Sequence, residues 1–277
     1  MHRTLFGLAS AIATVFLANS PLAQVIPEKQ LESLLPTQAL LLGEQHDATE
    51  HQTLARETVE WLSGRGQLAA LVIEMAQAPR HTAALPTSAS PAQVRDALAW
   101  SESVWPWKQY GPVVMAAVSA GVPVLGANLP LADLRAAMLR QQLDDALPGP
   151  ALKAQQQAIR LGHCGLLPES QIAPMTRIQI ARDQRMAQVL QSALVPGKVA
   201  LLVAGSGHVD KQLGVPQHLP SDFQVKVVVA QAGEAAGASG WTTGRTSADV
   251  RADAVWLTPA LPEKDYCADF KRATGAQ

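Results

Sequence analysis

The chain has 277 residues, of which 48% are hydrophobic and 16% charged, and its formal net charge is −1. This length and apolar content are enough for one large domain with a full hydrophobic core. The sequence has no cluster of Lys and Arg residues, so nucleic acid and anionic membrane surfaces are poor candidates as partners.

The first residues predict an export signal rather than a part of the fold. A short basic start precedes an apolar stretch, residues 5–17, which is too short to span a membrane as a mature helix, and small residues follow it. We expect cleavage after Ala23, with Ala18 as the alternative. Residues 1–23 are thus predicted to be a signal peptide and residues 24–277 a periplasmic domain. No Cys lies near the cleavage zone, so no lipid anchor is expected there.

Apolar runs alternate with helical patterns along the rest of the chain. The runs have the composition of strands buried on both faces, and they cover residues 40–42, 68–75, 122–128, 199–205 and 225–230. Apolar residues recur at helical spacing between them, over residues 53–62, 111–120, 131–147 and 174–194. Strands that alternate with helices predict a single α/β domain, with a mostly parallel sheet covered by helices on both faces.

Two helix starts carry capping patterns. Asp47 is followed three residues later by Glu50, which predicts a capping box at the start of the first of these helices. Ser90 stands before Pro91, which predicts an N-cap with proline at the first helical position.

Several of the buried runs end on residues that can carry chemistry. The first run is followed by Glu44 and His46, the second contains Glu74 near its end, and His208 follows the fourth. The carboxyl ends of parallel strands meet at one edge of a sheet, where open α/β proteins bind their ligands. These four side chains are therefore expected at one rim, and they indicate either a metal site or an acid–base site. The metal ligands would be Glu44, His46 and His208. The alternative is that Glu44 pairs with a basic residue and His46 only packs.

One arginine occupies the apolar stripe of the last long helical pattern. Arg182 is expected on a buried face, where an unpaired charge is very costly. We therefore expect Arg182 to contact Glu74 or Glu44, and the alternative is that its side chain reaches solvent along its stem. Asp183 lies off this stripe and is expected in solvent, as is His51 near the start of the first helix.

The chain has two cysteines, Cys164 and Cys267. In an oxidising compartment a disulfide between them would tie the C-terminal tail to the middle of the chain. Two free buried thiols are the alternative. His163, next to Cys164, belongs either to a functional site or to the corner of a disulfide.

Seven segments, in order along the chain, resemble the ChaN-like haem-binding proteins within the wider Tiki and erythromycin-esterase group. They are GEQHD at 43–47, IEM at 73–75, WPWKQYGP at 105–112, GVPVLGANLP at 121–130, GHCGLLP at 162–168, ARDQRMA at 181–187 and GSGHVDKQLGVPQHL at 205–219. The resemblance implies a periplasmic or outer-membrane-associated protein of haem and iron uptake, with the haem-uptake machinery as a partner. It also implies haem at a homodimer interface, a tyrosine on the iron and a histidine of the partner subunit at the propionates.

Two functions follow from this resemblance and from the strand-end residues. Haem binding would use Tyr110 as the axial ligand, with Tyr266 as the alternative, and His163 as the propionate contact. Hydrolysis is the second function, in which the strand-end residues and one arginine hold a divalent metal or act as acid and base: Glu44, His46, Glu74, Arg182 and His208. The sequence contains no Ser nucleophile elbow and no HExxH motif, so it offers no further support for catalysis.

Overall fold

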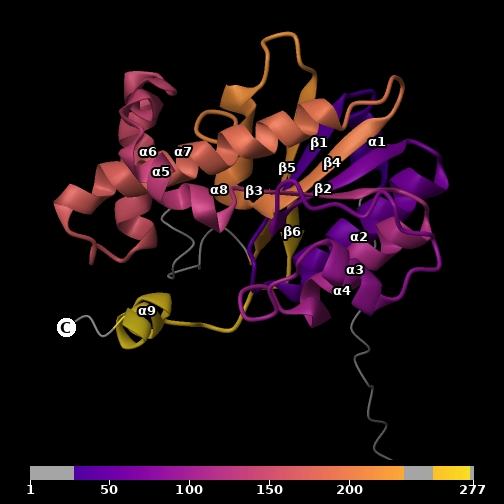
Figure 1. Ribbon diagram of the computed structural model, residues 1–277, viewed down its shortest axis with the longest axis horizontal. Helices are drawn as coiled ribbons and strands as arrows, with labels where there is room; N and C mark the ends of the chain where they lie inside the picture. Colours follow the sequence, from indigo (N-terminus) through magenta and orange to yellow (C-terminus); the bar gives the residue numbers. More distant parts are fainter. Residues whose placement is uncertain (1–27, 234–251, 275–277) are drawn as a thin grey trace, which may run out of the picture.

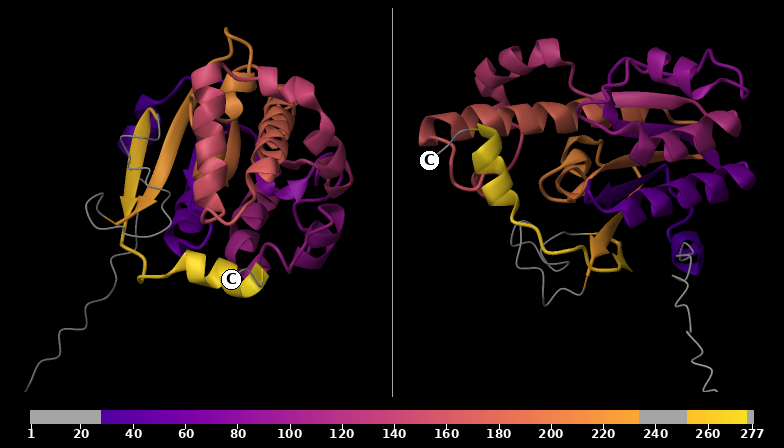
Figure 2. Two further views of the ribbon diagram at one scale, coloured as in Figure 1. Left: turned by 90° about the vertical axis from the view of Figure 1, so that its left-hand side faces the viewer. Right: turned by 90° about the horizontal axis from the view of Figure 1, so that it is seen from below.

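A parallel sheet between two layers of helices forms the centre of the protein (Figures 1 and 2). The structure is a computed structural model and describes residues 28–233 and 252–274. The predicted signal peptide lies outside these residues. Within the described ranges, no helix is long and apolar enough to cross a membrane.

All neighbouring strands of the sheet are parallel, in the order β3-β2-β4-β1-β5-β6. The strands are β1 (Ala39–Glu44), β2 (Leu68–Gln77), β3 (Val124–Asn128), β4 (Val199–Gly205), β5 (Val225–Ala232) and β6 (Ala254–Thr258). Five of them coincide with the predicted apolar runs, and β6 was not predicted. The prediction of a parallel α/β sheet is confirmed.

The helices connect these strands and pack against both faces of the sheet (Figure 2). They are α1 (Glu28–Ser33), α2 (Thr49–Gly64), α3 (Pro91–Ala97), α4 (Trp107–Ser119), α5 (Leu134–Leu139), α6 (Gly149–Gly162), α7 (Glu169–Ser192), α8 (Ser206–Val209) and α9 (Tyr266–Thr274). Short 3₁₀ turns add η1 (Leu131–Asp133), η2 (Gln141–Asp145) and η3 (Val215–His218).

The strands divide their side chains between the two helical layers. Successive residues of a strand point to opposite faces, so Leu40 and Leu42 of β1 join the core under α2 and α4. Leu41 joins the core on the other face, where Met186 and Leu190 of α7 cover it. Every residue of β1 is buried, which explains why its sequence is continuously apolar up to Gly43. The predicted cover of helices on both faces is confirmed.

A separate helical lobe, made of α5, α6 and the first half of α7, extends beyond the sheet (Figure 1). Its small core includes Leu143, Leu147 and Ile178. The prediction of one continuous helix over residues 131–147 is wrong, because the backbone leaves the helical region at Arg140, with ψ at 86°. The break divides the segment into η1, α5 and η2.

The two predicted helix starts have different outcomes. Ser90 accepts a hydrogen bond from the backbone N–H of Gln93, and the Gln93 side chain accepts one from the Ser90 N–H, so this N-cap is confirmed and forms a full capping box. The capping box at Asp47 is wrong, because α2 begins after Ala48 without a side-chain cap. Asp47 instead accepts a hydrogen bond from Tyr266, near the other end of the chain.

Candidate functional site

The carboxyl ends of β1, β2 and β4 bring Glu44, Glu74 and His208 to one rim of the sheet. His46 lies between the two glutamates, with Nδ1 at 2.9 Å from Glu44 Oε1 and Nε2 at 3.8 Å from Glu74 Oε2. The other oxygen of Glu74, Oε1, lies 3.4 Å from His208 Nε2. The prediction that these four residues meet at one rim is confirmed, and they alternate in sign when both histidines are protonated.

Glu44 is held from three sides. It is 1% exposed, and it accepts hydrogen bonds from the Tyr110 hydroxyl at 2.7 Å and from Gln52 Nε2 at 2.8 Å, besides its contact with His46. Burial, and then the neighbouring Glu44 carboxylate, raise the pKa of Tyr110 far above its usual range. The Tyr110 hydroxyl is therefore a hydrogen-bond donor that fixes Glu44. The contact of Gln52 with Glu44 was not predicted from the sequence.

Asp183 extends the network beyond the predicted residues. It is 0% exposed, and its Oδ1 lies 2.5 Å from His208 Nδ1. The expectation that Asp183 lies in solvent is wrong, because Asp183 belongs to a row of buried residues that recur at helical spacing along α7. This row is Thr176, Ile180, Asp183, Ala187 and Leu190. The sequence does contain this signal, in the small and apolar residues on either side of Asp183 along that row.

The charges of the network follow from these contacts. Burial alone would lower the pKa of His208, but Glu74 and Asp183 on either side raise it to about 10. Burial likewise opposes the ionised form of Glu74, but His208, His46 and the Gly205 N–H lower its pKa below the usual range. For Asp183 burial prevails over the attraction of His208, and its pKa rises to about 6. At neutral pH, His208 is an imidazolium between two buried carboxylates.

His46 is the member of the network that solvent reaches. Its side chain is 40% exposed, and the Trp105 ring packs edge-on against it with centroids 4.8 Å apart. Burial opposes its protonation, but Glu44 and Glu74 outweigh this effect and raise its pKa. Gly205 is needed beside it, because a Cβ there would come 2.9 Å from His46 Nε2. The site therefore opens at His46.

Arg182 does not take the predicted part in this network. It is half-buried, forms no ion pair with Glu74 or Glu44, and its Nε has no hydrogen-bond partner. It lies at the margin of the buried stripe of α7, one position before Asp183, and its charge only helps to lower the Asp183 pKa. The predicted buried pair is therefore wrong.

Replacing Arg182 with leucine is accordingly expected to cost about 1 kcal/mol or less, as for other groups without a buried partner. Urea unfolding measures this change. A loss above about 3 kcal/mol, the cost of breaking a buried ion pair, would restore the original prediction.

His51 has a structural role instead of the expected exposed position. It is buried, and its Nδ1 accepts the Gln45 backbone N–H at 2.9 Å, so its Nε2 carries the proton that it donates to Thr258 Oγ1 at 3.0 Å. Burial lowers its pKa to about 4, and the ring is neutral at physiological pH. His51 thus ties the loop after β1 to the end of β6.

The C-terminal helix reaches the opening of the site. The Tyr266 hydroxyl donates a hydrogen bond to Asp47 at 2.5 Å and lies 3.4 Å from Gln45 Nε2, on either side of His46 in the sequence. Burial, and then Asp47, raise the pKa of Tyr266 to about 12. Of the two tyrosines proposed as haem ligands, Tyr266 is half-buried and Tyr110 is fully buried.

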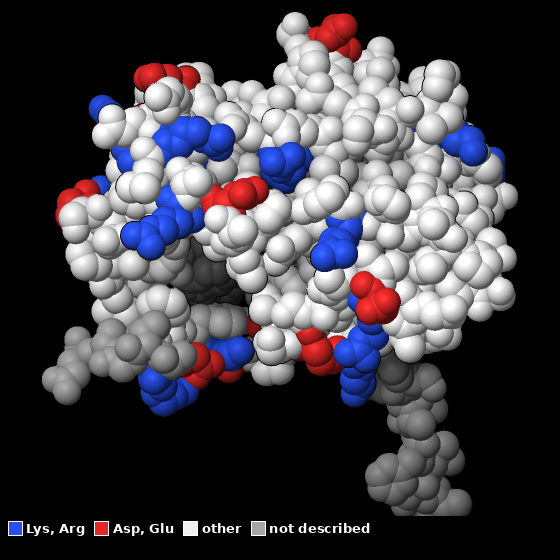
Figure 3. All heavy atoms as spheres, in the orientation of Figure 1, with Lys and Arg blue, Asp and Glu red and all other residues white. Residues whose placement is uncertain are grey.

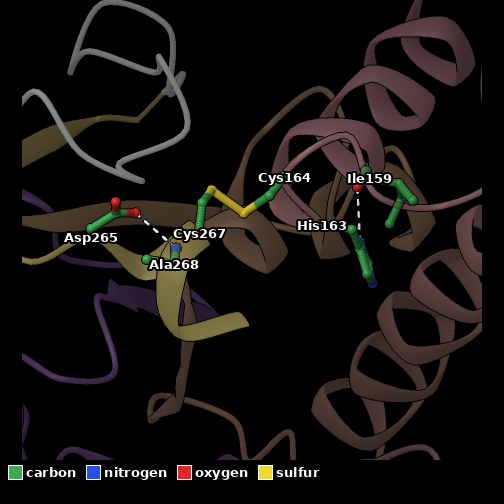
Figure 4. Close-up of a disulfide and its surroundings, with 6 residues drawn as sticks. All are labelled: Ile159, His163, Cys164, Asp265, Cys267 and Ala268. Atoms are coloured by element: carbon green, nitrogen blue, oxygen red, sulfur yellow. Dashed lines mark hydrogen bonds between the residues drawn. A yellow bond between two sulfur atoms is a disulfide. The ribbon is translucent and has the colours of Figure 1, made fainter. Parts of the chain in front are cut away.

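A disulfide joins this helix to the helical lobe (Figure 4). Cys164 and Cys267 are bonded, with their Cα atoms 5.6 Å apart, so the first of the two alternatives for the cysteines holds. His163 donates from Nδ1 to the Ile159 carbonyl at 2.8 Å, and its ring points away from the disulfide (Figure 4). The edge of this ring packs against Phe270 of α9.

The structure gives no support for a divalent metal at this site. In residues 28–233 and 252–274, no group of three or more His, Cys, Asp or Glu side chains has a metal-binding arrangement. Glu44 already accepts from three donors, and both nitrogens of His208 face carboxylates. The interpretation of Glu44, His46 and His208 as metal ligands is therefore unsupported, and the network is better described as paired acids and bases.

Comparison with known proteins places the chain in a family. The family model described as haem-binding uptake, Tiki superfamily, ChaN matches residues 30–219. Among solved structures, one described as cofacial haem binding to ChaN of Campylobacter jejuni is 27% identical, with a TM-score of 0.63 over 75% of this chain and 86% of that chain.

Two other structures are more distant. A mutant of the erythromycin esterase EreC in its open conformation is 14% identical, with a TM-score of 0.46 over 75% of this chain and 73% of that chain. A Bacillus cereus protein is 15% identical, with a TM-score of 0.39 over 74% of this chain and 69% of that chain. No curated protein sequence matches. On the family match over residues 30–219, the chain belongs to the ChaN family of haem-binding uptake proteins in the Tiki superfamily.

Proposed function

We propose that this protein binds haem in the periplasm and serves haem or iron uptake. The family match over residues 30–219 carries the proposal. The export pattern of residues 1–23 supports the location, and so does the disulfide, since disulfides persist in oxidising compartments.

The iron ligand that we propose is a tyrosinate, and Tyr266 is better placed for it than Tyr110. An iron at Tyr110 would have to displace Glu44 from a buried hydrogen bond, and the tyrosinate would then face that carboxylate. Tyr266 lies at the opening of the site, and Asp47 is positioned to accept its proton when ferric iron binds. The assignment of Tyr110 as the iron ligand stays a prediction, and phenylalanine variants of the two tyrosines test it.

The remaining haem contacts are proposed from the surroundings of Tyr266. His163, next to the disulfide, is the candidate for a propionate contact, and its Nε2 is not engaged in the hydrogen bond to Ile159. Phe270 and Trp105 offer aromatic surface against which a porphyrin can pack. The haem lies at a homodimer interface in this proposal, as the family resemblance implies.

A hemin titration of the purified mature chain tests the proposal. Tryptophan fluorescence should be quenched until hemin and protein reach a fixed ratio, because Trp105 lies beside the site. The mass of the loaded protein, from light scattering, should be that of a dimer. Haem binding would be contradicted if hemin quenched the fluorescence of the protein no more than it quenches that of free tryptophan in solution.

A second candidate function is metal-independent hydrolysis at His46. The half-exposed His46 ring between two buried carboxylates is the observation that favours it, because such a ring can exchange a proton with a substrate. Turnover of a p-nitrophenyl ester should then persist in EDTA and disappear in His46→Gln. Equal turnover by the two proteins, or none by either, would exclude this activity.

A further inference from the structure

The last part of the described chain forms a strap beside the open side of the site. We define the C-terminal strap as residues 259–274, which leave the sheet after β6 and end in α9 (Figure 1). Just before the strap, Thr258 at the end of β6 is hydrogen-bonded to His51 of α2. Further along, Tyr266 is bonded to Asp47, next to the exposed His46. Since the Tyr266 hydroxyl also lies 3.4 Å from Gln45 Nε2, the strap contacts the loop on both sides of His46 through this one residue.

Helix α9 is held by the Tyr266 hydrogen bond to Asp47, by the packing of Phe270 against His163 and by the disulfide. It has nine residues, and isolated helices of this length are marginal in water. None of its described side chains belongs to the hydrophobic cores of the sheet or of the helical lobe. The covalent bond between Cys267 and Cys164, which are 103 residues apart in the sequence, ties this short helix to the helical lobe.

The disulfide also brings together the two residues proposed to contact haem. Tyr266 and His163 each stand immediately before one of the bonded cysteines, whose Cα atoms are 5.6 Å apart. The surface is hollowed between the helical lobe, which carries His163, and α9, which carries Tyr266 (Figure 3). The bond thus joins the two segments that carry the candidate ligands.

We propose that the Cys164–Cys267 disulfide is a redox-sensitive latch that holds Tyr266 in its haem-binding position, so that breaking the bond weakens haem binding. This inference rests on the proposed function. A dithiol reductant supplies two electrons and two protons, which leaves both cysteines as thiols and the reductant as a disulfide. Helix α9 then separates from the helical lobe, while the sheet and its two cores remain folded.

The test compares hemin binding with the latch closed and open. Wild-type protein is reduced with dithiothreitol, alkylated with iodoacetamide and desalted, so that no thiol remains to bind iron, and a sample treated without reductant is the control. We expect hemin affinity to fall about tenfold or more in the reduced sample, because Tyr266 is no longer held where it can bind the iron. The charge-transfer band of ferric iron bound to tyrosinate should be lost as well. The Cys164→Ala/Cys267→Ala variant should match the reduced sample.

Two further measurements make each outcome decisive. Hydrogen exchange should rise on reduction in peptides covering α9 and stay unchanged in β1 and β4, which are fully buried. Equal hemin affinity in the two samples would overturn the latch and leave haem binding intact. Global unfolding on reduction would also overturn it, since the bond would then stabilise the whole domain. Absence of hemin binding in the oxidised sample would overturn the proposed function, and the latch with it.

Discussion

Replacing His208 with leucine is expected to lower the free energy of unfolding by about 3–5 kcal/mol, the cost of removing one partner from a buried ion pair. Glu74 and Asp183, which flank this imidazolium, are almost fully buried. Leucine fills much of the same space but leaves two carboxylates without their counter-charge. Urea unfolding at neutral pH measures the loss.

The pH dependence of the variant gives a second and more specific result. In the wild type, the His208 pKa is about 10 in the folded state against 6.5 unfolded, so its contribution is complete below 6.5 and lost as pH rises towards 10. In the variant, Asp183 keeps a pKa raised by burial and loses the charge that lowers it. The folded state then binds more protons than the unfolded state between pH 3.8 and the raised pKa of Asp183, so the variant should lose stability as pH rises from about 4 to beyond about 6, the Asp183 pKa in the wild type.

Two variants serve as controls for this result. His218 is a partly buried histidine outside the network, and burial lowers its pKa to about 4, so His218→Leu should cost only about 1 kcal/mol. Adding Asp183→Asn to His208→Leu should recover part of the loss, because one stranded charge is removed. A His208→Leu protein as stable as His218→Leu, with no pH dependence of its own, would show that His208 is not a buried cation.

Replacing Tyr266 with phenylalanine should weaken hemin binding by about tenfold or more and remove the tyrosinate-to-iron charge-transfer band. The ring and its packing remain, since phenylalanine has nearly the same volume, and only the coordinating oxygen is lost. The hydrogen bond to Asp47 is lost with it. An absorption titration with hemin measures both effects.

Tyr110→Phe is the matched control. It removes a buried hydrogen bond to the Glu44 carboxylate, and we expect it to cost about 1.5–3 kcal/mol of stability with the haem spectrum unchanged. The reverse pattern, with the band lost in Tyr110→Phe and kept in Tyr266→Phe, would assign the iron to Tyr110 as the sequence first indicated.

The rim of the site followed from the sequence because it depends on local signals. Strands buried on both faces are continuously apolar, and their carboxyl ends meet at one edge when they run parallel. Glu44 ends β1, Glu74 follows the last residue of β2 that pairs with β4, and His208 lies just beyond β4, so their proximity needed no knowledge of the loops. The residues that complete the network come from helices, where the face that turns inward depends on packing. The shift from Arg182 to Asp183 is such a case.

The position of α9 beside the site could not be predicted from the sequence, because it depends on contacts between distant segments of the chain. Asp47 has the local pattern of a helix cap, but it is bonded to Tyr266, 219 residues away. Strand β6, at the edge of the sheet, is different, because its four consecutive apolar residues, Ala254 to Leu257, were a local signal from which it could have been predicted. The disulfide was one of two alternatives, because two cysteines in a sequence do not state their separation in space.

The visible absorption spectrum of the mature protein with added hemin, with the disulfide intact, is the most direct test of haem binding through a tyrosinate. We predict a shifted Soret band that saturates at a fixed ratio of hemin to protein, together with the charge-transfer band of ferric iron bound to tyrosinate. A spectrum identical to that of free hemin at every ratio of hemin to protein would contradict haem binding through a tyrosinate.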